Sequence, residues 1–336
     1  MTAGCLPVQE TGGPTHCSTP NGRAVTHDRN QLARSAAIAS IIVAAILVAL
    51  KLWASVETNS VAMLGSLADS ALDLVASLVT LFGVVYAAMP ADDDHRFGHG
   101  KAEAIAAIVQ VVLIALSAFA LVVRSIQQWM EDAPVGEAPV GIGVSLVAIA
   151  LTFALLAWQR FVLARTGSVA IRPDHVHYQG DLLLNLAVIA ALVLQTQFGL
   201  GKADAVFGLG IAAWLAYGAW DASKEAVDHL MDREWPEEKR RAFVERAATH
   251  PELSNLHDLR TRTAGNRDFV QFHVDLPGSM SVRAAHDIID RVEDDLLEAF
   301  PGTELLIHID PEGHVDEPGN PLVETDEFEK LEDDTP

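Results

Sequence analysis

Basic residues are scarce in this chain. Its 336 residues include 23 lysines and arginines against 45 aspartates and glutamates, which gives a formal net charge of −22. Proteins that bind nucleic acid need basic patches, so this balance argues against a nucleic-acid partner. Half of the residues are nevertheless hydrophobic. An oily chain with so large a net charge is predicted to separate into an apolar part and an acidic, soluble part.

Cysteine is nearly absent. Cys5 and Cys17 are the only two, and they lie in a polar N-terminal segment together with His16 and His27. These side chains could bind a metal, or the cysteines could pair. The segment has the composition of a disordered tail, however, and we interpret both cysteines as free thiols. A cleavable signal peptide is not expected, because the first apolar run begins near residue 35, behind a polar stretch without a cleavage site.

Two motifs of ATP-driven and hydrolytic proteins are also missing. The P-loop pattern G-x-x-x-x-G-K-[ST] does not occur in the chain, which argues against ATP as an energy source. The pattern H-E-x-x-H does not occur either, which argues against a metallohydrolase of the membrane. We therefore predict that the chain is not an enzyme.

Six apolar runs are long enough to cross a bilayer as helices of about 20 residues. They cover residues 34–56, 60–88, 102–128, 139–161, 176–198 and 203–222. Arginine and lysine gather before the first run, between the second and third, and between the fourth and fifth. Such segments normally face the cytoplasm. We predict a multi-pass protein of the inner cell membrane with both termini cytoplasmic.

Ionisable residues at matched spacing lie inside two of these runs. Asp69 and Asp73 are four residues apart in the second run, and His177 and Asp181 are four apart in the fifth, so each pair shares one helix face. A carboxylate at bilayer depth costs roughly 2.5–3.5 kcal/mol on insertion scales and normally faces a partner or a polar cavity. One such aspartate could merely pack two helices by a hydrogen bond. Two facing pairs would instead offer three carboxylates and one imidazole, which suits a divalent cation.

The chain changes character near residue 224. Two amphipathic stretches and three alternating ones follow in the order αββαβ, which is typical of a small ferredoxin-like domain. The predicted fold is a membrane all-α six-helix transmembrane domain plus a cytoplasmic α+β ferredoxin-like (αββαβ) domain. We predict a disordered N-terminal tail, a transmembrane domain, a cytoplasmic metal-binding domain and an acidic disordered tail, at residues 1–31, 32–223, 224–315 and 316–336.

Two further groups of residues have the chemistry of metal ligands. One is in the loop after the second run, where two glycines would let the chain turn back on itself, although a solvated charged loop fits the spacing equally well. Its residues are Asp92, His95 and His99. The other combines histidines of three predicted strands and one helix with a carboxylate, a set suited to one or two zinc-like ions. Its residues are His257, His273, His286, His308 and Asp310.

Taken in order, these motifs resemble the cation diffusion facilitator family, and in particular its bacterial ferrous-iron/zinc efflux branch. The resemblance rests on the two membrane pairs and on the stretches DDDHRFGHGKAEA, HYQGD, HDLRTR and IHIDP. It extends from about residue 32 to residue 315. It implies a homodimer in the lipid bilayer that exchanges divalent metal ions for protons.

The resemblance also assigns roles to residues. It implies a transport site at the two membrane pairs, a loop site at the Asp92 group, and a cytoplasmic metal cluster at the Asp310 group that stiffens the dimer. Lys101 and Asp232 match the positions of an ion pair that links the two domains near the dimer axis. Three features depart from the family pattern: the cysteine-bearing N-terminal extension, the third aspartate of the loop, Asp94, and the acidic C-terminal tail.

The predicted function is therefore efflux of a divalent cation from the cytoplasm, coupled to protons. Zn²⁺ and Fe²⁺ are the expected ions, with Cd²⁺ a further candidate, and they serve as substrate and as ligand of the cytoplasmic cluster rather than as a catalytic cofactor. One imidazole among three carboxylates favours these ions over Mn²⁺, which prefers all-oxygen sites. Two alternatives stay open: a membrane-anchored metal sensor, and an exporter of the same family that prefers Mn²⁺ or Co²⁺.

Overall fold

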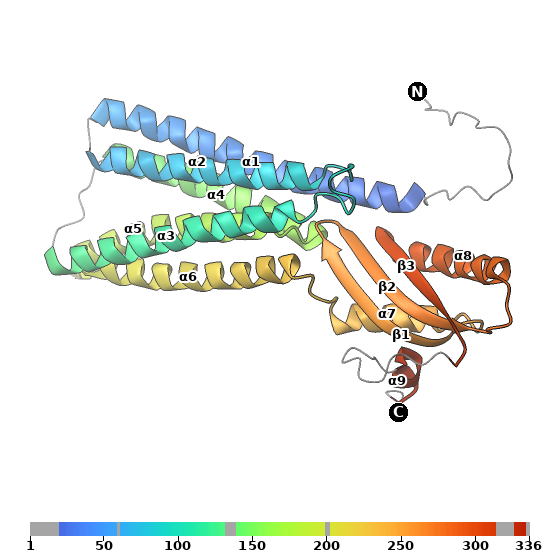
Figure 1. The fold of residues 1–336 in the computed structure, drawn as a ribbon. Helices are drawn as coiled ribbons and strands as arrows, with labels where there is room; N and C mark the ends of the chain where they lie inside the picture. The colour runs from blue at the N-terminus through green and yellow to red at the C-terminus, as the bar shows by residue number, and fades with distance from the viewer. Residues whose placement is uncertain (1–19, 59–60, 132–138, 199–201, 314–325, 334–336) are drawn as a thin grey trace, which may run out of the picture.

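The structure, a computed structural model, describes residues 20–58, 61–131, 139–198, 202–313 and 326–333 (Figure 1). Cys5, His16 and Cys17 lie outside the described residues, as does the side chain of His27. The predictions for the N-terminal thiols are therefore not addressed by the structure.

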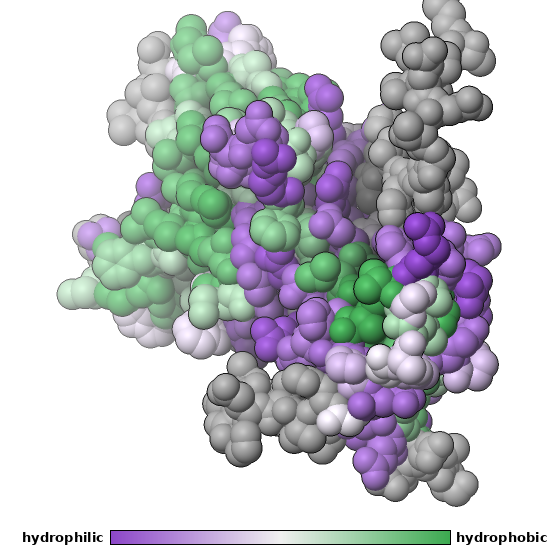
Figure 2. Space-filling view, turned by 45° about the vertical axis from the view of Figure 1, so that its right-hand side comes forward, coloured by the Kyte–Doolittle hydropathy of each residue, from purple (hydrophilic) through white to green (hydrophobic). Residues whose placement is uncertain are grey.

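Six long helices form an elongated bundle (Figure 1). They are α1 (Pro20–Thr58), α2 (Val61–Ala87), α3 (Ala102–Glu131), α4 (Pro139–Thr166), α5 (Ile171–Phe198) and α6 (Ala203–Leu230). Within the described residues, each contains a stretch long and apolar enough to cross a membrane. Figure 2 shows hydrophobic residues spread over the helical part, whereas hydrophilic residues are far more frequent over the sheet part. The prediction of six membrane-capable helices is confirmed.

Two predicted domain boundaries fall inside these helices. Helix α1 begins at Pro20, so residues 20–31 are helical rather than disordered. Proline suits the first helical position, and neither proline nor glycine interrupts residues 23–34. Helix α6 continues past residue 223 to Leu230, and the chain turns only at Asp232, whose φ is 54°. In both cases the helix outruns its apolar stretch, which is why hydropathy alone misplaced its end.

A small sheet domain lies at one end of the bundle (Figure 1). Its elements are α7 (Glu237–Ala247), β1 (Ser254–Ala264), β2 (Arg267–Leu276), α8 (Val282–Ala299) and β3 (Thr303–Pro311). The strand order is β1-β2-β3, with β1 antiparallel to β2 and β2 parallel to β3. A parallel neighbour needs a long crossover, which α8 supplies. The predicted αββαβ order is confirmed.

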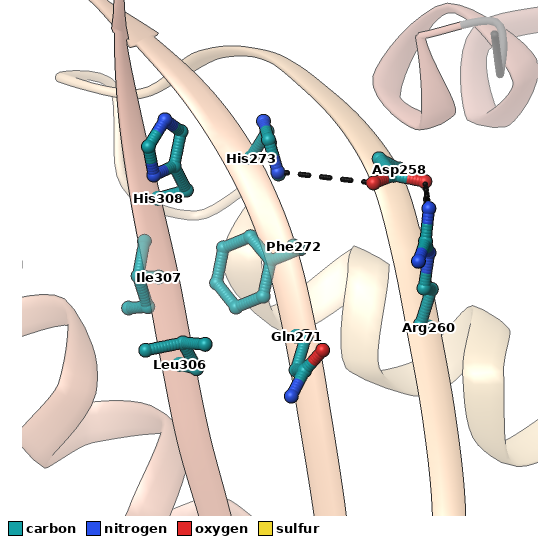
Figure 3. A pocket seen from close by; sticks show the side chains of 8 residues that line it. All are labelled: Asp258, Arg260, Gln271, Phe272, His273, Leu306, Ile307 and His308. Carbon is teal, nitrogen blue, oxygen red and sulfur yellow. Dashed lines mark hydrogen bonds and ion pairs between the residues drawn. The ribbon is translucent and has the colours of Figure 1, made fainter. Parts of the chain in front are cut away.

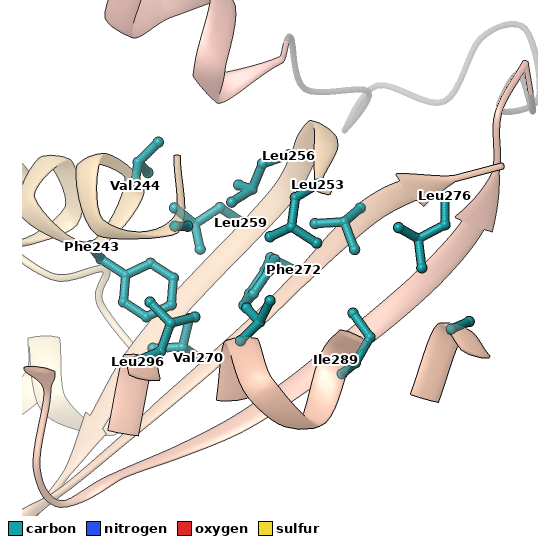
Figure 4. Packing of buried hydrophobic residues seen from close by; sticks show 14 of the residues in the cluster. Phe243, Val244, Leu253, Leu256, Leu259, Val270, Phe272, Leu276, Ile289 and Leu296 are labelled. Carbon is teal, nitrogen blue, oxygen red and sulfur yellow. The ribbon is translucent and has the colours of Figure 1, made fainter. Parts of the chain in front are cut away.

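Aromatic and aliphatic side chains from both helices and the sheet form the core of this domain. Phe243 of α7, Phe272 of β2 and Leu296 of α8 are fully buried and point toward one another in Figure 4. The rings of Phe243 and Phe272 meet edge to face, with centroids 5.6 Å apart. Ser281 caps α8, since its side chain accepts a hydrogen bond from the backbone N–H of Ala284, which stabilises a helix start.

The prediction of a disordered acidic tail is wrong for one segment. Residues Glu327–Asp333 form helix α9, whose Phe328 and Leu331 pack against the core of the sheet domain. Glu327 is buried, and its Oε1 lies 2.7 Å from Nη2 of Arg240 on α7. Two apolar residues three apart give a short helix a packing face, which the acidic composition of the tail concealed.

Backbone atoms meet directly where the bundle joins the sheet domain. A Cβ atom added at Gly100 would lie 2.2 Å from the carbonyl oxygen of Ala264, and one at Gly265 would lie 2.9 Å from Cα of Gly100. Gly265 also turns the β1–β2 hairpin with a φ of 63°, a conformation that favours glycine. The loop after α2 and the hairpin can approach this closely only because neither glycine has a side chain.

Charged and aromatic groups surround this backbone contact. Lys101 Nζ lies 2.9 Å from Oδ2 of Asp232 and also donates a hydrogen bond to the carbonyl of Leu230, at 3.3 Å. Arg262 places its guanidinium over the rings of Phe97 and Phe269, 4.7 and 4.6 Å from their centroids. The loop after α2, the end of α6 and the β1–β2 hairpin thus form one joint.

We predict that Gly100→Ala destabilises the full-length protein by about 1–3 kcal/mol, the usual cost of overpacking. Gly143 in α4 is the matched control, because a Cβ there meets nothing within 4 Å and alanine in a helix is favoured over glycine by roughly 0.5–1 kcal/mol. Thermal unfolding in detergent compares the two variants. Equal melting temperatures for Gly100→Ala and Gly143→Ala would contradict the packing described for the joint.

Candidate metal centres

The first cluster lies between α2 and α5, within membrane-capable stretches. Asp73 comes from α2, and His177 and Asp181 come from α5, with one ligand atom of each lying within 4.8 Å of the others. His177 Nε2 is 2.8 Å from Asp73 Oδ1 and 3.7 Å from Asp181 Oδ2. The side chain of Asp73 is 14% exposed, that of His177 is 12% exposed and that of Asp181 is 29% exposed. Two carboxylates and one imidazole nitrogen therefore converge on a space the size of one cation.

Asp69 is not part of this convergence. Its Oδ2 instead lies 3.6 Å from Nη1 of Arg124 on α3, and its side chain is 56% exposed. The prediction grouped it with Asp73 because residues four apart share a helix face. One helical turn also moves a residue about 5.4 Å along the axis, and at this level Asp69 contacts α3 through Arg124.

A polar network beside this cluster was missed by sequence reasoning. Asp174 on α5 is buried, and its Oδ2 accepts hydrogen bonds from Ser40 Oγ of α1 at 2.7 Å and from Gln159 Nε2 of α4 at 2.8 Å. Gln110 Nε2 of α3 lies 3.5 Å from its Oδ1. Asp174 precedes His177 by three residues and lies just outside the predicted run. A carboxylate at that position is expected to lie in the polar region that flanks a membrane helix. The network ties α5 to three other helices directly beside the metal ligands.

The second cluster lies in the loop after α2 and brings together Asp92, His95 and His99, as expected. The loop turns at Gly98, whose φ is 80°. Asp92 Oδ2 lies 3.2 Å from Nε2 of His99, and Asp92 Oδ1 lies 3.2 Å from Nδ1 of His95. A hydrogen bond from the backbone N–H of His95 lowers the pKa of Asp92 below its usual range, so the carboxylate stays ionised, the form that binds a cation.

His99 is held ready for this role by a second contact. Its Nδ1 lies 3.2 Å from the carbonyl oxygen of Pro90, which can only accept a hydrogen bond. In this contact Nδ1 is the donor, and Nε2 is the ring atom that faces Asp92. Backbone carbonyls fix metal-binding histidines in this way.

The third cluster lies on the sheet and contains His257, His273 and Asp310. Asp310 Oδ2 is 2.9 Å from Nδ1 of His273 and 3.7 Å from Nε2 of His257. Strand register explains the meeting, because His257 pairs with His273 across β1 and β2. Irregular register on either side of His257 bends the strand as bulges do near functional sites, and the ring Nδ1 bonds the carbonyl of Asn255 at 2.8 Å.

His308 lies beside the third cluster, whereas His286 lies apart from it. His308 pairs with His273 across β2 and β3, and its Nε2 lies 3.5 Å from Asp310 Oδ1, so it borders the cluster. With His273 and Asp258 it lines a cavity of about 210 Å³ on the sheet (Figure 3). Asp258 was not predicted, yet its Oδ2 lies 3.8 Å from Nε2 of His273.

His286 does not join the sheet cluster in this structure. It is exposed on α8, and its Nδ1 lies 2.8 Å from Asp290 Oδ1 on the same helix. A hydrogen bond of its own backbone and the Asp290 carboxylate raise the pKa of His286. A raised pKa favours the protonated ring, which cannot bind a metal.

Comparison with known proteins adds independent findings. Residues 37–231 match the family described as the cation efflux transmembrane domain, and residues 235–312 match the cytoplasmic domain of cation efflux proteins. The cation-efflux pump FieF of Cronobacter sakazakii is 40% identical over 287 residues, which cover 85% of this chain and 95% of that protein. The cation-efflux pump FieF of Escherichia coli O127:H6 is 41% identical over 281 residues, covering 84% and 93%.

Among solved structures, the metal-bound C-terminal domain of the CzcD transporter from Thermotoga maritima is 25% identical. The match covers 24% of this chain and 99% of that chain, with a TM-score of 0.23.

We predict that Asp310→Ala reduces the stabilisation of the full-length protein by Zn²⁺. A ligand at a hundredfold excess over its Kd stabilises a folded protein by about 2.7 kcal/mol, and Asp310 contacts both other members of the sheet cluster. Melting temperatures in detergent, with and without Zn²⁺, measure the effect. Asp287→Ala, an exposed change on α8, is the control and should shift as the wild type does. If Zn²⁺ did not change the melting temperature of the wild-type protein, the sheet cluster would not be a metal site.

Proposed function

The chain belongs to the cation efflux family. We propose that it exports a Zn²⁺- or Fe²⁺-like cation in exchange for protons, because of the ligands in its first cluster, called the membrane cluster below. It is a multi-pass membrane transporter rather than an enzyme. The observation that carries the proposal is the convergence of Asp73, His177 and Asp181 between two membrane-capable helices. Ionisable groups at such depth mark ion pathways.

The ligand chemistry supports the choice of ion. An imidazole nitrogen is a borderline ligand that suits zinc and ferrous iron, whereas magnesium, calcium and manganese prefer oxygen alone. The cluster offers one such nitrogen, on His177, beside the carboxylates of Asp73 and Asp181. Asp69 would complete a four-ligand shell once its carboxylate turns from Arg124 toward α5.

Proton exchange follows from the contact between His177 and Asp73. The two groups lie 2.8 Å apart, and this hydrogen bond requires a proton between Nε2 and the carboxylate oxygen. A metal ion needs the lone pair of the same nitrogen and the same carboxylate, so its binding displaces the proton. Protons from outside would in turn displace the metal, and helix rearrangement around the site would expose it to each side alternately.

The joint between the two domains indicates the orientation of the helices in the membrane. The sheet domain matches the cytoplasmic domain of the family, and Asn266 in its hairpin donates a hydrogen bond to Asn30 of α1, at 2.8 Å. The N-terminal part of α1 therefore shares the cytoplasmic side. With six membrane crossings, both termini are cytoplasmic. The second cluster, in the loop after α2, lies on this cytoplasmic side and would bind metal before transport.

Association of two copies is the remaining part of the proposal. The family matched by residues 235–312 is named for dimerisation, and we propose a homodimer joined through the cytoplasmic domains. The sheet cluster would stiffen that domain, and the ion pair of Lys101 with Asp232 would transmit its position to the bundle. A membrane-anchored metal sensor is the second candidate, favoured by the sheet cluster alone. It would leave the membrane ligands without a purpose.

We predict that Asp181→Ala lowers Zn²⁺ flux into proteoliposomes by about 100-fold or more, because even groups that only support metal ligands are worth 10- to 100-fold. Asp204→Ala, at the start of α6, is the matched control and should transport normally. A sensor would show no flux in the wild type either. Near-normal flux through the Asp181 variant would refute the site assignment.

We also predict that His177→Asp raises the ratio of Mn²⁺ to Zn²⁺ transport by about tenfold, equivalent to 1.4 kcal/mol. The change replaces the only nitrogen ligand of the cluster by a hard oxygen. Competition assays with both ions in the same vesicles measure the ratio, and anaerobic assays extend it to Fe²⁺. An unchanged ratio would mean that ion choice is made elsewhere in the protein.

A further inference from the structure

An arginine inside α3 has no part in the sites described so far. Arg124 is the only basic residue of the thirty in Ala102–Glu131 and is surrounded in sequence by LVV and SI. Arginine is as costly as aspartate within a bilayer and normally has a partner there. Its guanidinium also keeps its proton at every physiological pH. Helix α3 therefore carries a permanent positive charge that needs an anion.

The anion that it meets is a predicted metal ligand. Arg124 Nη1 lies 3.6 Å from Asp69 Oδ2. Among the described residues, no other arginine or lysine forms an ion pair with Asp69, Asp73 or Asp181. Lys51 of α1 also reaches α2, but its Nζ bonds to neutral oxygens, the Ser70 hydroxyl at 2.6 Å and the Ser66 carbonyl at 3.3 Å.

The ion pair lies on one particular side of the metal cluster. Helix α2 runs from Asp69 through Asp73 to Ala87, and the loop that follows joins the sheet domain. Asp69 is therefore one turn farther from the cytoplasmic domain than Asp73. The exposed fraction of the side chain rises in the same direction, from 14% at Asp73 to 56% at Asp69 and 67% at Arg124. Arg124 stands at the side where an exported ion leaves.

From this geometry we propose that Arg124 competes with the metal for Asp69. When no metal occupies the site, the guanidinium holds this carboxylate through the contact seen between Arg124 and Asp69. When a metal fills the site, Asp69 turns inward to ligate it and the ion pair is broken. Re-forming the pair removes one ligand on the outer side and so promotes release. The proposal rests on the export function proposed above.

The charge balance gives this competition its physical basis. Loss of a divalent cation leaves uncompensated carboxylates among apolar helices, where charge is expensive. Arg124 neutralises one of them without a proton, so fewer protons are needed to return the empty site. A divalent cation and a guanidinium repel one another across a shared carboxylate, so metal binding at Asp69 weakens its ion pair with Arg124. Arg124 is a positioning residue here, since it acts on the metal through Asp69.

The test begins with Zn²⁺ flux in proteoliposomes made from R124Q, R124K and wild-type protein. We expect R124Q to lower both KM and kcat by about two- to fivefold, the upper range of an exposed ion pair, because the metal is held more tightly and released more slowly. R124K keeps the charge and should restore most of both values. R124M serves in place of R124Q if the latter elutes as an aggregate. Unchanged KM and kcat in R124Q, as expected if Arg124 merely reaches toward lipid headgroups, would overturn the proposal.

A double variant separates this proposal from the export function. In D69N protein the guanidinium has no carboxylate to hold, so adding R124Q should leave the Zn²⁺ affinity measured in detergent unchanged. An equal effect of R124Q on affinity with and without Asp69 would overturn the competition. If wild-type vesicles carry no Zn²⁺, the export function fails, yet the affinity cycle still decides whether Arg124 acts through Asp69.

Discussion

The cost of placing ionisable groups between apolar helices governs the helical part of this protein. Asp174 is satisfied by Ser40 and Gln159, and Glu103 accepts hydrogen bonds from the Ser168 hydroxyl and the backbone of Val169. Each of these buried carboxylates takes its partners from a different segment of the chain. The groups that need solvation therefore influence which helices lie together, and Asp174 lies three residues before the metal ligand His177 on α5.

The sheet domain has only a small hydrophobic core. Its strands carry histidines at positions that the register makes neighbours, so that His273 lies between His257 and His308 in the sheet. Asp310 reaches all three from β3. A metal bound there would connect all three strands. Alignment of strands, rather than any loop, creates the cluster, and the fold and the site depend on the same hydrogen bonds.

The sequence sufficed for features that depend on local pattern. Six apolar lengths, the αββαβ order and the spacing of Asp92, His95 and His99 follow from residues close in the chain. The contact of Asp69 with Arg124 could not be predicted, because it depends on how α2 is rotated between α3 and α5. His286 lies outside the sheet cluster in this chain, where it contacts Asp290 of its own helix. The α9 segment was concealed by its acidic composition, although Phe328 and Leu331 carry its packing.

Helix α1 has 39 residues, which at 1.5 Å per residue makes it about 58 Å long. The hydrocarbon part of a bilayer is only about 30 Å thick, so nearly half of this rod projects beyond it. The projecting part touches the sheet domain through Asn30 and Asn266. A rigid rod anchored in the bilayer magnifies any tilt at its free end. A change in the tilt of the first helix would therefore displace its projecting end, and with it the hairpin that Asn266 joins to α1.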